Sequence, residues 1–294
     1  MAGRALRIAL IVILTSAVAP GLASAKIGAA IANTGNTIAA ATLQPPGVPQ
    51  STHPSGTAGT VNLSWSASGS GFVTGYQVRR ATAPGGPFST TVCSGAGRSC
   101  TDTGAAYNGQ YYYRAVATFN NWTAQSGTAM ALSLAPTAGS DTTTTVYTFN
   151  AGDIADLALP DASVFAGTGY YTTNAAWASG GFQANRYLEF RYSPVVAAGA
   201  PVSRVRVTLI YGISVANSAA TFRLQVSPDG GATWTNFTLP NPGAALTAYT
   251  TTVDITSVAG TPGAVQNLRL RFQAAAQTGA TFLSGHDIVH VDVN

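Results

Sequence analysis

Side chains able to perform acid–base or nucleophilic chemistry are sparse in this chain of 294 residues, which has ten Asp and Glu residues and three His. The single glutamate, Glu189, lies between Arg186 and Arg191, where a surface ion pair accounts for it. Glycoside hydrolysis ordinarily needs two carboxylates that flank the scissile bond, and the aspartates are too dispersed to supply a partner for Glu189. The pattern therefore disfavours a glycosidase.

The histidines near the C-terminus are the next candidates, because His286 and His290 flank Asp287. A Ser/His/Asp site also needs an activated serine, and the sequence has no G-x-S-x-G elbow to present one. Strand positions four residues apart are separated by about 13 Å, too far for both imidazoles to bind one ion. Dinucleotide and P-loop motifs are missing as well. We expect a protein without catalytic residues, and the alternative is a secreted hydrolase with an unrecognised site.

Aromatic side chains that face solvent could instead bind a ligand, since flat rings combine a large contact surface with a polar edge. Trp122, which follows Phe-Asn-Asn between two expected strands, should be the most exposed of them. The alternative is a core or loop-anchoring role, because large aromatics are mostly buried. The candidate ligand-binding residues are Trp122, Tyr170, Tyr171 and Trp177.

Short runs of alternating apolar and polar residues must form the elements that position these side chains. In one run Val205, Val207 and Leu209 alternate with Arg206 and Thr208. Such period-two runs, bounded by Gly and Pro, are typical of strands with one buried face. No stretch of ten residues has a convincing helical period. The sequence predicts an all-β protein with two β-sandwich domains.

The N-terminal residues 1–25 have the pattern of a secretory signal. Arg4 and Arg7 precede the apolar run 8–18, and Ala23-Ser24-Ala25 is an A-x-A cleavage site. The run is shorter than the roughly 20 residues that span a bilayer, so we expect cleavage and secretion rather than the alternative, an uncleaved anchor. No later segment is apolar enough to cross a membrane. Residues 26–44 are expected to be a flexible lead, and an added strand is the alternative.

Two cysteines, Cys93 and Cys100, lie close together in the sequence. In the oxidising environment that an exported protein meets, a disulfide between them is favoured, and we expect it to pin a local hairpin. A metal pair or a redox site is disfavoured because no further ligand lies nearby and the spacing is not C-x-x-C.

Charged residues make up only 8% of the chain, against roughly 25% in an average soluble protein. Loss of Arg4 and Arg7 with the signal lowers the formal net charge from +4 to +2. The remaining arginines are scattered along the expected strands and form no evident basic patch, whereas nucleic-acid binders gather Lys and Arg on one face. We therefore expect no nucleic-acid partner.

Three landmarks follow one another in the first half of the chain: Trp65 in NLSW, Tyr76 in GYQV, and an alternating strand from Tyr111 to Ala117. In these features residues 45–135 resemble a fibronectin type III module, with a core tryptophan, a third-strand tyrosine and a Y-x-Y-x-V-x-A strand. The resemblance implies that the Tyr111 hydroxyl bonds to backbone near the preceding turn. Ala115 stands where that family prefers Val.

Residues 136–145 lack apolar side chains and are expected to be a linker. From residue 146 to 294 the chain looks like a jelly-roll sandwich of the kind appended to secreted hydrolases and adhesins. Its strands 268–272 and 287–293 resemble the closing strands of carbohydrate-binding-like sandwiches, some of which hold a structural Ca²⁺. The carboxylates that could supply oxygen ligands are Asp153, Asp156, Asp287 and Asp292, and solvated or turn-capping aspartates are the alternative.

The segment SPDGGATW, residues 227–234, matches the Asp-box pattern S-x-D-x-G-x-T-W. In a hairpin turn Asp229 would accept backbone N–H groups, the glycines would supply positive φ, and Trp234 would pack back on the hairpin. We interpret Ser227, Asp229, Gly231 and Trp234 as a structural hairpin without a catalytic role.

These patterns together predict a secreted, non-catalytic binding or structural protein, such as a surface or adhesion module. Its partner would be a cell-surface or extracellular polysaccharide or protein, and no cofactor is expected other than the calcium named above. The alternative is a glycan-binding accessory protein in polysaccharide degradation.

Overall fold

The computed structural model describes residues 41–52, 60–106, 108–143, 147–148 and 170–294, with the single positions 154, 157, 164 and 165. The expected signal, most of the expected lead, and Asp153 and Asp156 lie outside the described residues. The described chain is built from antiparallel strands that form two β-sandwiches, which confirms the predicted all-β class. Among these residues no helix is long and apolar enough to cross a bilayer.

The first sandwich packs a small sheet against part of a large one. The small sheet has the order β1-β2-β5, and the large sheet contributes β8-β6-β3-β4, with β7 paired to β6. The strands are β1 (Gln50–Thr52), β2 (Val61–Ser64), β3 (Gly75–Ala81), β4 (Thr90–Gly95), β5 (Ser99–Asp102), β6 (Gln110–Phe119), β7 (Trp122–Gln125) and β8 (Ala129–Leu134). Burial in β2 alternates residue by residue, as the period-two pattern predicts.

The aromatic landmarks of the first half belong to the core of the first sandwich or pack against it. Trp65 and Tyr76 are buried and meet edge to face, with ring centroids 6.1 Å apart. The Tyr111 hydroxyl accepts a hydrogen bond from the backbone N–H of Ala106 at 3.2 Å, which confirms the expected corner contact. Gly109 makes this contact possible, because a Cβ there would lie 2.8 Å from the Tyr111 hydroxyl oxygen.

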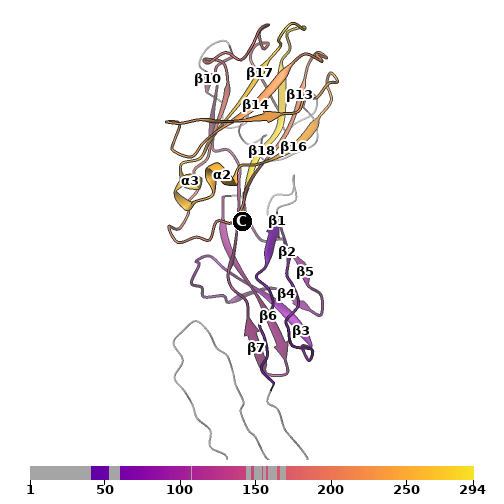
Figure 1. The fold of residues 1–294 in the computed structure, drawn as a ribbon, viewed down its shortest axis with the longest axis vertical. Coiled ribbons are helices and arrows are strands. Elements are labelled where there is room, and N and C mark those ends of the chain that lie inside the picture. The colour runs from indigo at the N-terminus through magenta and orange to yellow at the C-terminus, as the bar shows by residue number, and fades with distance from the viewer. Residues whose placement is uncertain are drawn as a thin grey trace, which may run out of the picture.

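The second sandwich packs a six-stranded sheet, β10-β9-β12-β17-β14-β15, against the other end of the large sheet, β16-β13-β18, where β11 also pairs with β18. The strands are β9 (Ala138–Asp141), β10 (Tyr147–Thr148), β11 (Tyr171–Thr172), β12 (Leu188–Arg191), β13 (Val205–Ile213), β14 (Thr221–Ser227), β15 (Thr235–Leu239), β16 (Tyr249–Asp254), β17 (Arg269–Ala275) and β18 (Ser284–Val293). Two short helices, α2 (Thr256–Ala259) and α3 (Pro262–Gln266), lie between β16 and β17. Figure 1 shows both helices at the end of the second sandwich that is nearer the first sandwich.

The expected linker 136–145 is wrong at residues 138–141, which form β9 and pair with β12. Strand hydrogen bonds come from the backbone, so a segment of small polar residues can join a sheet without apolar side chains. Buried Asp141 fixes the segment: its carboxylate accepts hydrogen bonds from the Tyr171 hydroxyl at 2.8 Å and from the Asn174 N–H at 2.9 Å. The second sandwich therefore draws its first strand from the segment that looks like a linker.

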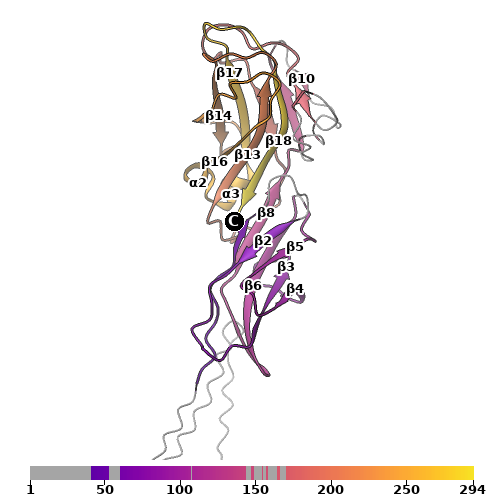
Figure 2. The ribbon, with the colours of Figure 1, turned by 90° about the vertical axis from the view of Figure 1, so that its right-hand side faces the viewer.

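Strand β8 joins the two sandwiches, since it pairs with β6 along one edge and with β18 along the other. Leu132 is opposite Gln110 on one side and Val293 on the other. One hydrophobic core runs across this junction and includes Met130 as well as Val291. Figures 1 and 2 accordingly show two bodies end to end, with strands continuing from one to the other and the C-terminus at the junction.

The disulfide between Cys93 and Cys100 is confirmed. Its place in the fold differs from the expectation of a local hairpin, because β4 pairs with β3 whereas β5 pairs with β2. The bond therefore connects the two sheets of the first sandwich at one edge.

We expect the double variant Cys93→Ser/Cys100→Ser to lose about 2.5 kcal/mol of unfolding free energy, because the disulfide closes a short loop in the unfolded chain. Urea denaturation monitored by tryptophan fluorescence measures the change. Dithiothreitol should destabilise the wild type by a similar amount and leave the double variant unaffected. Equal stability of the oxidised wild type and the variant would contradict the prediction.

Candidate functional site

Two of the four aromatic candidates for ligand binding belong to the core. Trp177 is 1% exposed, and its indole N–H donates to the Ser284 hydroxyl at 2.9 Å. Tyr171 is 5% exposed and bonds to Asp141. The expectation that these two rings form part of an exposed platform is wrong, because both pack between the sheets of the second sandwich.

The other two candidates are half-buried and lie in different sandwiches. Trp122 begins β7 and contacts Phe119 edge to face, with ring centroids 6.2 Å apart. In Figure 1, β7 is at the far end of the first sandwich from the junction. Tyr170 precedes β11 in the second sandwich. Trp122 and Tyr170 therefore do not form one site.

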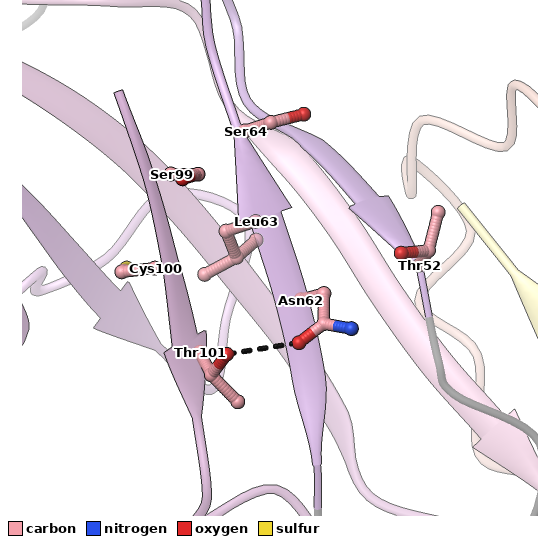
Figure 3. A pocket seen from close by; sticks show the side chains of 7 residues that line it. All are labelled: Thr52, Asn62, Leu63, Ser64, Ser99, Cys100 and Thr101. Carbon is pink, nitrogen blue, oxygen red and sulfur yellow. Dashed lines mark hydrogen bonds between the residues drawn. The ribbon is translucent and has the colours of Figure 1, made fainter. Parts of the chain in front are cut away.

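A shallow hollow of about 260 Å³ lies on the small sheet of the first sandwich. Asn62 accepts a hydrogen bond from the Thr101 hydroxyl across it at 2.9 Å, as Figure 3 shows. The hollow offers neither a charged side chain nor an aromatic ring to a ligand. Its lining residues are Thr52, Asn62, Leu63, Ser64, Ser99, Cys100 and Thr101.

A more distinctive surface is the outer side of the six-stranded sheet. The register places Glu189, Arg271, Gln225 and Asn236 in one row across β12, β17, β14 and β15. Because alternate residues of a strand share a side, the neighbouring rows on this side contain further arginines. We call this surface the arginine face and define it by Arg191, Arg223, Arg269 and Arg271 with Glu189, Gln225, Gln273, Phe182, Tyr187 and Trp234.

Glu189 is the centre of the arginine face. Its carboxylate accepts hydrogen bonds at 2.8 Å from Nε of Arg191 and from Nε of Arg271, and Nη1 of Arg269 lies 3.5 Å away. The expected surface ion pair is therefore corrected: Glu189 is buried, and its partners include two arginines from β17. Burial by itself would raise the pKa of Glu189, but the hydrogen bonds from Arg191 and Arg271 outweigh it and hold the pKa below its ordinary value.

Aromatic rings hold two of the guanidinium groups in place. The Arg271 guanidinium lies 3.8 Å from the ring centroid of Tyr187 and 3.9 Å from that of Trp234. The Arg223 guanidinium lies 4.2 Å from the ring centroid of Phe182. Stacking of this kind suits the flat guanidinium and restricts its motion. The arginine face is therefore an ordered arrangement of planar groups.

The β14–β15 hairpin positions Trp234 over the arginine face. Asp229 accepts hydrogen bonds from the Thr233 hydroxyl at 2.6 Å, from the Thr233 N–H at 2.9 Å and from the Ser227 hydroxyl at 2.7 Å, and these bonds hold its pKa well below the ordinary value. Gly231 has a φ of 102°, and its carbonyl accepts from the Trp234 indole N–H at 3.0 Å. These contacts have the structural role that we expect for the hairpin.

The sheet concentrates positive charge that looks scattered in the sequence. Three of the four arginines of the face contact one carboxylate, Glu189, and a second carboxylate, Asp229, lies in the hairpin at the edge of the face, which leaves a formal excess of two positive charges. The expectation that the arginines form no patch is therefore wrong. The alternation in LRLRF puts Arg269 and Arg271 on one side of a strand, but only the pairing of β12 with β17 brings Arg191 beside them.

A serine and a histidine do meet in the second sandwich, since the Ser284 hydroxyl and Nε2 of His286 are 3.1 Å apart. Both residues are fully buried, and His286 is surrounded by the rings of Phe190, Tyr211 and Phe272. Burial lowers the pKa of His286 to about 3, so the imidazole is neutral at physiological pH. A polymer could not reach this pair without opening the core.

The aspartates named for calcium do not form a suitable ligand set within the described part of the chain. Asp292 accepts from the Ser133 hydroxyl at 3.2 Å and lies 3.4 Å from His290 Nε2, and Asp287 is fully buried. Ca²⁺ needs six to eight oxygen ligands, whereas the described residues contain no group of three acidic, His or Cys side chains placed to hold a metal. With Asp153 and Asp156 outside the described residues, this calcium site stays a prediction.

Several solved structures are similar to this chain over part or most of its length. A Fn3-like protein from Clostridium thermocellum is 32% identical over 29% of this chain and 86% of that chain, with a TM-score of 0.26. SGBP-B from a complex xyloglucan utilization locus in Bacteroides uniformis is 13% identical over 85% of this chain and 73% of that chain, with a TM-score of 0.33. A structure of carbohydrate-binding modules from the β-sandwich superfamily is 13% identical over 84% of this chain and 97% of that chain, with a TM-score of 0.29. No protein-family model and no curated protein matches the sequence.

Proposed function

We propose that this chain is a secreted, non-catalytic glycan-binding protein whose binding site is the arginine face. The observation that carries the proposal is the stack of Tyr187, Arg271 and Trp234, with the Gln225 amide beside it on the sheet surface. Flat rings offer a broad apolar surface, and the guanidinium and amide edges offer directed hydrogen bonds. A sugar ring, which has apolar faces and a rim of hydroxyl groups, complements both.

The order of the arginine face supports binding. Gln225 donates a hydrogen bond to Asn236 at 2.9 Å, and the buried Gln273 side chain orients Arg223 by accepting a hydrogen bond from its Nε at 2.8 Å. A ligand that binds side chains already held in place loses less conformational entropy than one that must order them. The regular strands beneath the arginine face add further rigidity.

The residues with acid–base capacity in the second sandwich support a non-catalytic role. Glu189 is bound to arginines and kept ionised, so it is unsuited to donate a proton as a general acid. The Ser284 and His286 pair is sealed in the core. Secretion is supported by the signal pattern of residues 1–25 and is compatible with the disulfide.

The proposal is tested by co-sedimentation with insoluble polysaccharides, neutral and acidic. We expect saturable binding to at least one of them, reduced at least tenfold in Trp234→Ala because the stacked ring is lost. Trp122→Ala is the matched control, since it removes the same side chain from the first sandwich, and it should bind as the wild type does. Tyr187→Ala provides a second test in case Trp234→Ala disturbs the hairpin.

Two results would contradict the proposed function. One is the lack of saturable binding to any polysaccharide of the set. The other is loss of binding in Trp122→Ala with full binding in Trp234→Ala and Tyr187→Ala, which would move the site to the first sandwich. Thermal unfolding of each variant verifies that the protein used is folded.

A further inference from the structure

We propose that the arginine face recognises an acidic polysaccharide, and that Arg191 and Arg269 together bind a carboxylate of its sugars. This inference rests on the proposed function and names the class of glycan. It starts from two arginines of the face that reach solvent: the side chain of Arg191 is 48% exposed and that of Arg269 is 37% exposed.

Arg191 and Arg269 are directly opposite each other on the neighbouring strands β12 and β17. Side chains in such a pair have Cβ atoms about 5 Å apart, and two like charges there repel each other. A single oxygen, Oε1 of Glu189, serves both guanidinium groups, at 2.8 Å from Nε of Arg191 and 3.5 Å from Nη1 of Arg269. The other oxygen, Oε2, is taken by Arg271. One buried carboxylate thus compensates the pair only in part.

The terminal nitrogens of Arg191 give the pair its capacity for an anion. Arg191 binds Glu189 through Nε, so this ion pair does not use its two Nη groups. The side chain that carries these groups is 48% exposed. Guanidinium groups bind carboxylates through two parallel N–H donors. An acidic sugar lying on the face could therefore place its carboxylate between Arg191 and Arg269 and complete the neutralisation that Glu189 begins.

The neighbouring hairpin keeps this end of the face open and ordered. Gly231 comes so close to Arg269 that a Cβ at this position would lie 3.3 Å from Nη1 and 3.7 Å from Cδ. The same hairpin holds Trp234 against Arg271. The anion site and the stacked rings are thus adjacent, so one sugar chain could contact both.

The amount of charge favours an acidic polysaccharide over a nucleic acid. Nucleic-acid binders neutralise many closely spaced phosphates with many Lys and Arg residues. The arginine face has an excess of only two positive charges, gathered where β12 and β17 pair. An excess of this size can neutralise one or two carboxylates of a sugar chain, which carries fewer charges per unit length than a nucleic acid.

Affinity gel electrophoresis with polygalacturonate and with its fully methyl-esterified form tests the inference, because the two polymers share a backbone and differ in charge. We expect wild-type protein to bind the acid at least tenfold more tightly than the ester. The double variant Arg191→Gln/Arg269→Gln should lose at least tenfold in affinity for the acid and retain its affinity for the ester. Arg98→Gln, which removes one charge from an exposed position of the first sandwich, is the control and should bind like the wild type.

The outcomes separate this inference from the proposed function. Equal binding of acid and ester, with both lost in Trp234→Ala, would overturn the carboxylate site and leave glycan binding intact. Binding to none of the polysaccharides would overturn both. Tighter binding to single-stranded DNA or to dextran sulfate than to polygalacturonate would also overturn the inference, because the face would then be a general polyanion site.

Discussion

The Trp177→Ala variant is expected to be about 4 kcal/mol less stable than the wild type, because it removes the largest fully buried side chain of the second sandwich. The Trp177 ring packs edge to face on Phe272, with centroids 6.1 Å apart, and its N–H satisfies the buried Ser284 hydroxyl. The variant therefore loses apolar contacts, creates a cavity, and leaves a buried polar group with one partner fewer. Urea denaturation monitored by circular dichroism measures the effect.

Two related variants give this prediction its controls. Trp177→Phe keeps a ring in the cavity and should recover more than half of the loss. Trp122→Ala replaces a half-buried tryptophan of the first sandwich and should cost clearly less than Trp177→Ala. A Trp177→Ala protein of wild-type stability would show that this side chain does not lie in the core.

The Glu189→Gln variant is expected to lose about 3 kcal/mol of unfolding free energy. Removing one partner of a buried ion pair commonly costs 3–5 kcal/mol, and the lower end applies because Arg191 and Arg269 reach solvent. Glutamine has the size of glutamate but no charge, so Arg191, Arg269 and Arg271 would repel one another without compensation. Chemical denaturation at neutral pH measures the loss.

The same ion-pair cluster should make stability depend on pH. Because the pKa of folded Glu189 lies below the ordinary value, its stabilisation is fully present above the pKa of the unfolded chain, roughly 4.3. It should be lost progressively as the pH falls from there through the lower pKa of the folded state. The difference in stability between the wild type and Glu189→Gln should therefore shrink over that acidic range. A difference that stays constant down to pH 2 would contradict the assignment.

An exposed ion pair provides the control for Glu189. Arg204 lies 3.3 Å from Asp254, and both side chains are about half exposed. Exposed pairs contribute little, so Arg204→Gln should change the free energy of unfolding by less than about 1 kcal/mol. An effect as large as that of Glu189→Gln would mean that burial is not what makes the Glu189 cluster important.

Local sequence patterns were sufficient to predict several features of the structure. The alternation of Val205, Val207 and Leu209 predicts β13, in which all three are fully buried. The spacing of Cys93 and Cys100 predicts the disulfide. In each case the interacting residues are near in sequence, or the periodicity of a strand determines which side of it is apolar.

Features that depend on distant neighbours were missed. Residues 138–141 lack the apolar side chains typical of strands, and they form β9 because β12 is available to pair with them. Trp177 lies outside the regular strands and looks exposed in sequence, but Phe272 and Ser284, about a hundred residues further along the chain, enclose it. Propensity and periodicity do not contain such information.

The sequence by itself determined that this chain forms strands with one apolar side, that two cysteines can pair, and that a tight hairpin ends at Trp234. Only the tertiary structure decided that Glu189 meets Arg271, 82 residues away, and that four arginines share one surface. The reason is that the two-residue period determines on which face of its strand a residue lies. Which residues of other strands lie beside it depends on the pairing and register of the strands. The proposed binding surface therefore depends on how β12, β17 and β14 pair.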